Sequence, residues 1–386
     1  MAHFFGGNQI KLLRNGAEYF PALEAAIESA AISIYLQTYI YEADATGKRI
    51  GNALKSAAKR GVAVNVLLDG FGCKDLAKTY IQELKEAGVR VILFRPKISP
   101  WTLKKNRLRR LHRKVAVIDE TIAFVGGINI IDDTNVPHQT APRIDYAVRL
   151  EGPILIAIVA SVCKLWRRLN WVNRGLVKGN VDKIHVHKPP QTSNSGLRAA
   201  LVVRDNILHR RDIEQAYLTA ISHAKSEIII ANAYFLPSRK FRKALIASAK
   251  RGVTVKLLLQ GRKEYFLMFA THAFYNEFLN NGIEIYEYQK SFMHSKVAVV
   301  DSKWATVGSS NMDPFSLLLA YEANVVVEDI TFAKELRTEI MTSMEEGASR
   351  VTSNGWKRDS KVKYFFSWTA YGLVRVFLGV IGHSND

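Results

Sequence analysis

The chain has only two cysteines among its 386 residues, Cys73 and Cys163. Two cysteines outside any metal-ligand spacing do not provide a disulfide framework or a zinc site, and they favour a reducing compartment. The first residues, Met-Ala-His-Phe-Phe-Gly-Gly, lack the basic region and apolar run of an export signal, so none is expected. The Gly-x4-Gly-Lys-Ser/Thr loop of nucleotide sites and the His-Glu-x2-His helix of zinc enzymes are also absent. These common routes to nucleotide or metal chemistry are therefore not indicated.

Negative charge is scarce as well. Lys and Arg total 54 against 35 Asp and Glu, which gives a formal net charge of +19. Such an excess predicts an anionic partner, either nucleic acid or an anionic membrane surface, and charge alone does not choose between them. The length allows two domains or one large one with a sizeable core.

One pattern, His-x-Lys-x4-Asp-x6-Gly-[Gly/Ser]-x-Asn, occurs twice. The first copy comprises His112, Lys114, Asp119, Gly126, Gly127 and Asn129, and the second His294, Lys296, Asp301, Gly308, Ser309 and Asn311. A phosphodiester needs a nucleophile on one side, a proton donor to the leaving oxygen on the other, and cations around its non-bridging oxygens. A doubled His and Lys set supplies all three. The repeat therefore predicts one phosphoryl-transfer site built from two halves.

The residues around each copy suggest how this site is built. Each lysine starts an apolar run, 115–118 or 297–300, that is typical of a buried strand. His and Lys two positions apart on a strand point from the same face. The turn that follows is expected to bring backbone N–H groups and an amide side chain to the phosphate. These phosphate-binding candidates are Gly127, Asn129, Ser309 and Asn311.

An internal repeat extends beyond the motifs. Residues 56–70 reappear as residues 248–261, each time as a helix end, a Gly stop and a strand, and further apolar runs precede them at 32–40 and 227–235. Alternating strands and helices predict an α/β fold, with a mixed sheet flanked by helices in each half and a pseudo-twofold axis through one shared site. The expected divisions are a first half at 1–176, a linker at 177–195 that contains Pro189-Pro190, a second half at 196–345 and a tail at 346–386.

The doubled motif resembles the phospholipase D superfamily, over nearly the whole chain from about Gln9 to about Glu328. The finer match is to bacterial cardiolipin synthases of the B type. It rests on four stretches: Arg110-Leu-His-Arg-Lys-Val-Ala-Val-Ile-Asp119, Asp145-Tyr-Ala-Val-Arg-Leu-Glu-Gly-Pro153, Ile230-Ala-Asn-Ala-Tyr-Phe235 and Gly308-Ser-Ser-Asn-Met-Asp-Pro314.

The resemblance implies roles for individual residues. His112 would form the phosphoenzyme and His294 would protonate the leaving alcohol, although the sequence does not determine which histidine attacks. Asp145 and Glu322 match the acidic positions that orient the two imidazoles. The motif aspartates, Asp119 and Asp301, belong to the catalytic signature, but each ends a strand, where fixing the next turn is the alternative role. The scheme requires no metal, nucleotide or organic cofactor.

The implied activity is that of a phosphatidyltransferase. It would make cardiolipin from two phosphatidylglycerol molecules, release glycerol and proceed by ping-pong kinetics on the cytoplasmic face of the inner membrane. Phosphatidylethanolamine is a second possible donor, and neither nucleic acid nor an obligate protein partner is expected. The alternatives are a phospholipase D-type hydrolase, a transphosphatidylase that uses another donor or alcohol, a nuclease of the superfamily, and a non-catalytic membrane-binding protein.

Three further segments bear on the membrane. The tail from Trp356 to Ile381 joins a basic cluster to an aromatic, apolar stretch, as in an interfacial anchor, and Arg375 argues against a full span. A terminal helix that packs on the core is the alternative. The basic run from Lys97 to Arg113, with Trp101, is a candidate rim for lipid headgroups or else a solvated face. A helix from about Pro153 to Trp171 is expected in the core rather than at the membrane.

Overall fold

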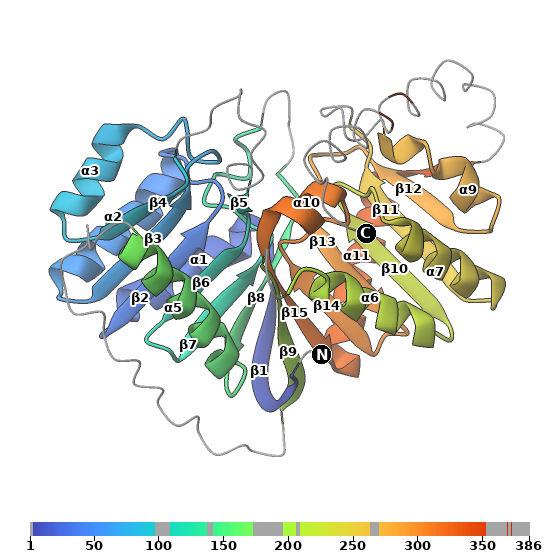
Figure 1. The fold of residues 1–386 in the computed structure, drawn as a ribbon, viewed down its shortest axis with the longest axis horizontal. Coiled ribbons are helices and arrows are strands. Elements are labelled where there is room, and N and C mark those ends of the chain that lie inside the picture. The colour runs from blue at the N-terminus through green and yellow to red at the C-terminus, as the bar shows by residue number, and fades with distance from the viewer. Residues whose placement is uncertain are drawn as a thin grey trace.

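Strands and helices alternate along both halves of the chain. The computed structural model describes residues 3–96, 109–136, 142–172, 196–205, 209–262 and 270–352, together with the single positions 369 and 372. The expected linker and nearly all of the tail beyond Thr352 lie outside these residues, as do residues 97–108 of the basic run. Figure 1 shows the two halves side by side, with strands β1 (Phe5–Arg14) and β9 (Leu197–Arg204) between them.

Each half contributes a similar succession of elements. The first contains β1 (Phe5–Arg14), α1 (Asn15–Ser29), β2 (Ser33–Thr38), α2 (Ala45–Lys59), β3 (Ala63–Asp69), α3 (Lys78–Glu86), β4 (Arg90–Phe94), β5 (Arg110–Leu111), β6 (Lys114–Ile118), β7 (Ile122–Gly126), β8 (Tyr146–Glu151) and α5 (Leu155–Val172). The second contains β9 (Leu197–Arg204), α6 (Asp212–His223), β10 (Glu227–Asn232), α7 (Arg239–Lys250), β11 (Thr254–Gln260), α9 (Tyr275–Leu279), β12 (Glu284–Tyr288), β13 (Lys296–Val300), β14 (Trp304–Gly308), α10 (Pro314–Leu319), β15 (Ala320–Glu328), α11 (Ile330–Gly347) and β16 (Ala348–Val351).

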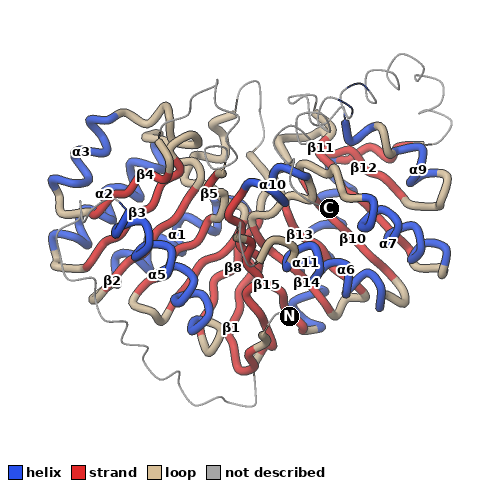
Figure 2. Tube along the Cα trace, viewed as in Figure 1, coloured by secondary structure: helices blue, strands red, loops and turns tan. Residues whose placement is uncertain are grey.

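The sheet is mixed in both halves. Strands β2, β3 and β4 are parallel, whereas β6, β7 and β8 follow in antiparallel order on the other side of β2. The second half repeats this plan with β10, β11 and β12 and then β13, β14 and β15. Antiparallel pairing of β1 with β9 joins the two half-sheets. Figure 2 shows the strands of both halves, with β1 between them. The expected α/β fold with two similar halves is confirmed.

The sequence repeat marks equivalent helix ends. Gly61 follows α2 with φ of +92°, and Gly252 follows α7 with φ of +90°, a backbone region that L side chains rarely adopt. The residue between the helix and the glycine is an arginine in both cases, Arg60 after α2 and Arg251 after α7. Each guanidinium donates to three carbonyl groups at the end of the preceding helix, α1 or α6. Both halves thus stop their helices by the same device.

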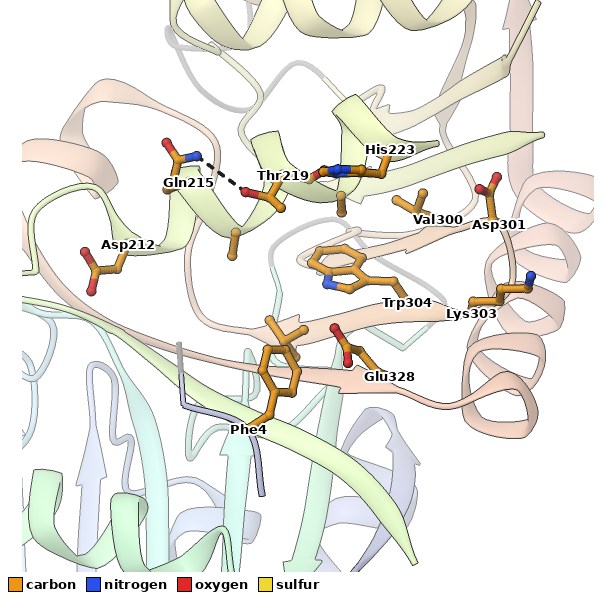
Figure 3. A pocket seen from close by; sticks show the side chains of 13 residues that line it. Phe4, Asp212, Gln215, Thr219, His223, Val300, Asp301, Lys303, Trp304 and Glu328 are labelled. Atoms are coloured by element: carbon orange, nitrogen blue, oxygen red, sulfur yellow. Dashed lines mark hydrogen bonds between the residues drawn. The ribbon is translucent and has the colours of Figure 1, made fainter. Parts of the chain in front are cut away.

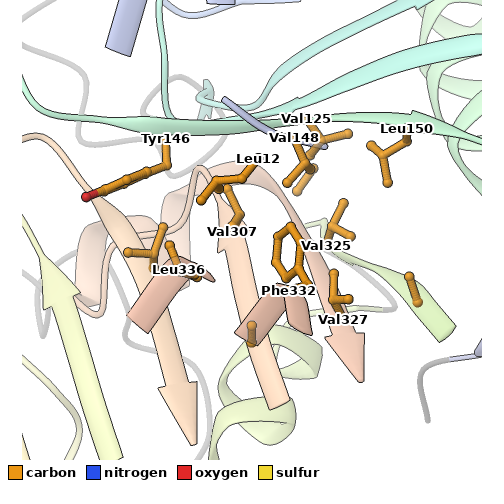
Figure 4. Packing of buried hydrophobic residues seen from close by; sticks show 14 of the residues in the cluster. Leu12, Val125, Tyr146, Val148, Leu150, Val307, Val325, Val327, Phe332 and Leu336 are labelled. Carbon is orange, nitrogen blue, oxygen red and sulfur yellow. The ribbon is translucent and has the colours of Figure 1, made fainter. Parts of the chain in front are cut away.

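One apolar core lies between the halves. It unites valines of β7 and β8 with valines of β14 and β15, and α5 and α11 close it. Figure 4 shows side chains of both halves meeting there, among them Val125, Val148, Val307 and Val325. Outer cores lie under α1, α2 and α3 in the first half and under α6, α7 and α9 in the second. Because the shared core needs both inner faces, the halves are packed as one unit.

The helix expected at 153–171 is α5, and its apolar face is buried, as predicted, partly in that core and partly in a smaller cluster that contains Leu165 and Trp166. Helix α11 runs to Gly347, and β16 then pairs with β12. The ordered second half therefore continues to Val351, beyond the boundary expected at residue 345. Among the helices of the described ranges, none is both long and apolar enough to cross a bilayer.

Candidate active site

Each histidine is attached to the opposite half through the backbone. Strand β5, directly before His112, pairs with β15, and the His112 N–H donates to the carbonyl of Tyr321 at 3.0 Å. In the same way, the His294 N–H donates to the carbonyl of Ile144 at 2.8 Å, and the Ile144 N–H donates to the carbonyl of Phe292 at 3.0 Å. Both motifs therefore meet at one edge, where β6 and β13 begin.

The orienting carboxylates cross between the halves. His112 Nδ1 lies 2.9 Å from Glu322 Oε1, and His294 Nδ1 lies 2.6 Å from Asp145 Oδ2. Each half therefore supplies the buried carboxylate that orients the histidine of the other half. When Nδ1–H donates to the carboxylate, Nε2 is left as the basic nitrogen that can attack phosphorus or carry a proton.

The two lysines are buried beside the histidines. Lys114 Nζ donates to the carbonyl of His112 at 2.6 Å, and Lys296 Nζ donates in the same way to the carbonyl of His294. Burial lowers the pKa of Lys114 to about 7 and that of Lys296 to about 8, against the attraction of Glu322 and Asp145. Lys296 also lies 3.7 Å from Asp145 Oδ2. The site thus confines two ammonium groups where a phosphate would relieve their mutual repulsion.

The surroundings of both histidines disfavour protonated imidazoles. Burial, followed by the charges of Lys296 and Arg143, holds the pKa of His294 well below its usual value. Burial also lowers the pKa of His112, although Glu322 opposes the shift. Burial raises the pKa of Asp145 to about 6. Each histidine feels the lysine of the other motif, which shows that the two copies form one electrostatic site.

Gly127 and Ser309 contact the orienting carboxylates rather than an open anion site. Their backbone N–H groups donate to the carbonyls of Tyr146 and Ala323. The sequence predicted that these N–H groups would bind phosphate, but they are already engaged in these bonds. A Cβ at Gly127 would lie 2.3 Å from Asp145 Oδ1, and only glycine leaves room for that carboxylate. Ser309 instead donates its hydroxyl to Glu322.

The two motif asparagines differ in their contacts. Asn129 Oδ1 accepts the backbone N–H of Ile40 at 3.0 Å and so fixes the end of β2. Asn311 is also buried, and among the described residues its Oδ1 has no hydrogen-bond partner. This oxygen accepts hydrogen bonds, so a substrate hydroxyl could satisfy it but a phosphate oxygen could not. A contact of Asn311 with phosphate would have to come from its Nδ2 group, and it stays a prediction.

The motif aspartates lie at the far ends of β6 and β13, away from the His–Lys edge. Asp119 accepts the backbone N–H groups of residues 31, 32 and 33, each at 2.8 Å. Asp301 accepts those of residues 225, 226 and 227 at 2.8 to 3.0 Å. Partial burial acts to raise the pKa of Asp301, but these donors lower it overall. The contacts show a structural role, but at the turns that precede β2 and β10 rather than at the turns that follow the aspartates, and they place neither carboxylate among the reacting groups.

Further residues at the site are not part of the motif. The ring of Tyr39 lies 4.8 Å from that of His112, with the Lys114 ammonium 5.3 Å from its centre. Asp69, fully buried at the end of β3, accepts the Leu111 N–H at 2.7 Å and so holds the strand that carries His112. Residues 56–70 were recognised as a repeat, but nothing in that repeat signals a contact with the histidine.

The basic run needs one correction. Arg113 is buried, so it cannot belong to a rim that receives headgroups. Its Nε donates to Gln37 and its Nη1 to Ser161 of α5. Arg110 lies 3.6 Å from Asp69. The expected rim thus keeps only residues that the structure does not describe, together with Arg109 and Arg110.

A large apolar pocket lies elsewhere. This cavity of about 860 Å³ opens between α6 and β14 and includes Phe4, Trp304 and Asp301 among its lining residues. Figure 3 shows Trp304 and Phe4 in it, with Asp301 at its edge. Because Asp301 ends the strand that Lys296 begins, this pocket lies at the opposite end of β13 from the histidines.

Comparisons with known proteins agree with this arrangement. The family described as "Cardiolipin synthase, PLD-like domain" matches residues 23–139 and 217–344. Cardiolipin synthase B of Escherichia coli K12 is 40% identical over 388 residues, and that of Salmonella typhimurium is 38% identical over 387, in both cases with 97% of this chain and 90% of the relative covered. A probable cardiolipin synthase of Bacillus subtilis is 30% identical over 97% of this chain and 72% of its own length.

Solved structures share the fold. Phosphatidylserine synthase of Haemophilus influenzae superposes with a TM-score of 0.68 at 12% identity, over 96% of this chain and 93% of the other. Polyphosphate kinase of Porphyromonas gingivalis gives a TM-score of 0.57 at 14% identity, over 95% of this chain and 53% of the other. At such identities the likeness concerns the fold alone.

Proposed function

The chain belongs to the phospholipase D-like cardiolipin synthase family, and we propose that it makes cardiolipin by transferring a phosphatidyl group between two phosphatidylglycerol molecules. The observation that carries the proposal is that each catalytic imidazole is bonded to a carboxylate from the other half of the chain. His112 with Glu322 and His294 with Asp145 offer two basic nitrogens, one for attack and one for proton transfer.

In the first step, His112 Nε2 attacks the phosphorus of the donor lipid. A nitrogen–phosphorus bond forms, the bond from phosphorus to the glycerol oxygen breaks, and His294 gives its proton to that oxygen. Glycerol leaves, and the phosphatidyl group stays on His112. His294 can be protonated at this stage because the bound phosphate brings negative charge to a site whose own cations disfavour imidazolium.

In the second step, His294 takes the proton from a hydroxyl of a second phosphatidylglycerol. The oxygen attacks phosphorus, the nitrogen–phosphorus bond breaks, and cardiolipin leaves with His112 neutral again. The first product leaves before the second substrate reacts, which gives ping-pong kinetics. Lys114 and Lys296 neutralise the non-bridging oxygens throughout, and their depressed pKa values rise when that anion is bound.

Membrane association is part of the proposal. The basic, aromatic segment from Trp356 to Ile381 is typical of an interfacial anchor on anionic lipid. We infer peripheral attachment to the cytoplasmic face of the inner membrane. The net charge of +19 serves the same anionic surface.

The decisive experiment incubates purified protein with phosphatidylglycerol vesicles, with and without phosphatidylethanolamine, and identifies the lipids by mass spectrometry. Cardiolipin and released glycerol in equal amounts support the proposal. Phosphatidic acid as the main product would indicate a hydrolase instead. Cardiolipin that forms only when phosphatidylethanolamine is present would show that phosphatidylethanolamine, not phosphatidylglycerol, is the donor.

Substitution of either histidine tests the mechanism. His112→Ala and His294→Ala should each lower turnover by several orders of magnitude and leave the thermal unfolding midpoint nearly unchanged, because the two groups act as one unit. More than a tenth of the normal activity in either variant would contradict the two-histidine scheme.

Activity should also persist in excess chelator, since the lysines hold the phosphate.

A further inference from the structure

We propose that Arg143 binds the phosphate of the acceptor lipid, on the His294 side of the site. The inference deepens the proposed function, because it names the group that recognises an anionic acceptor. It concerns only the second step, when the phosphatidyl group is already on His112.

Arg143 and His294 both contact the ring of Phe292. Its guanidinium carbon lies 5.6 Å from the centre of the Phe292 ring. Phe292 is in turn stacked on the imidazole of His294, with ring centres 6.0 Å apart and planes at 21°. The Arg143 N–H donates to the carbonyl of Asp133 at 3.1 Å, which fixes the backbone beside β8. The charge is therefore held beside the imidazole without touching it.

Nothing in the described part of the chain neutralises this guanidinium by direct contact. Its Nε is buried and has no hydrogen-bond partner among the residues that the structure describes. The carboxylates of Asp133 and Asp145 feel its charge, but among the described residues neither forms an ion pair with it within 4.0 Å. A buried donor without a partner costs free energy, which an anionic ligand would recover.

Among the described residues, the position on the His112 side that corresponds to Arg143 holds no arginine. By the sequence repeat, Arg143 precedes Asp145 by two positions, as Ala320 precedes Glu322. Phe292 likewise corresponds to Arg110, and that guanidinium lies 3.6 Å from the carboxylate of Asp69. The duplicated architecture is therefore electrostatically unequal, with the uncompensated cation beside His294.

The chemistry of the two steps assigns a role to this inequality. The donor's leaving group is glycerol, which is neutral and needs no cation next to the acid. The acceptor is a whole phosphatidylglycerol, and its own phosphate lies three carbons from the attacking hydroxyl. While His294 takes the proton of that hydroxyl, the second phosphate must lie a short distance beyond the imidazole. Arginine, with its fixed fork of donors, suits a phosphate there.

The test is to compare acceptors in Arg143→Gln, with Arg149→Gln as the control, since Arg149 of β8 pairs with Glu151. The assay supplies phosphatidylglycerol vesicles with or without a neutral short-chain alcohol and measures glycerol release, cardiolipin, phosphatidic acid and the phosphatidyl ester of the alcohol. With the alcohol present, Arg143→Gln should lower the ratio of cardiolipin to phosphatidyl ester at least tenfold and leave glycerol release within about twofold, because the alcohol can then take the phosphatidyl group from His112. Arg143→Lys should restore much of the ratio, and Arg149→Gln should not change it.

Two results would overturn the inference. An unchanged ratio in Arg143→Gln means that the guanidinium does not recognise the acceptor. With the alcohol present, an equal fall of glycerol release and of all three lipid products, at a normal unfolding midpoint, means that Arg143 acts on the first step or only supports His294. The unmodified protein is assayed in parallel. If it makes no cardiolipin, both the proposed function and this inference are wrong.

Discussion

At the scale of single residues, the pairing of imidazoles with carboxylates decides what the site can do. Glu322 orients His112, and Asp145 orients His294, so neither half of the chain holds a complete catalytic unit. Equivalent positions in the two copies of the motif do not hold identical residues. Ser309 donates to Glu322, whereas Gly127 only makes room for the shorter Asp145. Two similar motifs thus present two unequal histidines.

The crossing predicts distinct effects of two conservative substitutions. Glu322→Gln should impair the first step, because the amide no longer favours the His112 tautomer with a free Nε2. Asp145→Asn should impair proton transfer by His294. Each should lower turnover at least a hundredfold with little change in vesicle binding. Rapid-quench trapping of the phosphatidyl-enzyme separates them: it should vanish in Glu322→Gln with an activated donor that needs no acid, and form in Asp145→Asn. The reverse result would show that the pairs do not act as they are placed.

The motif aspartates give a second prediction, which concerns stability. Asp119→Ala removes the acceptor of three backbone N–H groups at the start of β2, and Asp301→Ala does the same at β10. Each should lower the free energy of unfolding by about 1 to 3 kcal/mol. At a temperature where the variants stay folded, turnover should remain within about threefold of normal. A loss of several hundredfold in a fully folded variant would return the aspartates to the catalytic set.

The sequence identified most residues of this site but not their geometry. His–Lys spacing and buried valine runs predicted the strands β6 and β13 correctly, since alternation on a strand is a local property. The orienting role of Glu322 followed from the family resemblance, yet its partner could not, because the crossing depends on how β5 and β15 meet. Arg143 and Tyr39 carry no local signal, and only the tertiary structure brings them to the histidines.

At the scale of elements, the repeat predicted the strands and helix ends well, and the basic run poorly. Charge in a sequence suggests exposure, but Arg113 lies at the beginning of β6, where the same strand direction that exposes His112 and Lys114 to the site turns the residue between them inward. Gln37 of β2 and Ser161 of α5 supply oxygens for its donors. A buried guanidinium here joins the sheet to α5.

Substitution of Arg113 tests that role against the rim hypothesis. Arg113→Ala leaves the oxygens of Gln37 and Ser161 without donors and should lower the free energy of unfolding by about 2 to 5 kcal/mol. Binding to phosphatidylglycerol vesicles should be unchanged in the folded fraction. Urea unfolding and vesicle sedimentation provide the two measurements, with Arg109→Ala as the matched control from the same run. Weaker sedimentation with unchanged stability would place Arg113 on the surface instead.

At the scale of the whole molecule, the shared core and the crossed pairs have the same cause. Valine faces of β7 and β8 can be buried only against β14 and β15, and this packing brings the start of β6 to the start of β13. The β1–β9 pairing then joins the two half-sheets into one. One chain therefore forms one site, and the two motifs that complete it come from the same molecule.

This intrachain assembly gives the last prediction. A mixture of His112→Ala and His294→Ala chains should stay as inactive as either alone, even after unfolding and refolding together, because each folded chain still lacks one histidine. If the halves instead exchanged between two chains, the same contacts could form across a dimer, and a fraction of mixed dimers would hold one intact site. Activity after co-refolding is compared with a co-refolded mixture of unmodified and doubly substituted chains. Recovery of roughly a tenth or more of that reference would require exchange of halves, whereas no recovery fits a core shared within one chain.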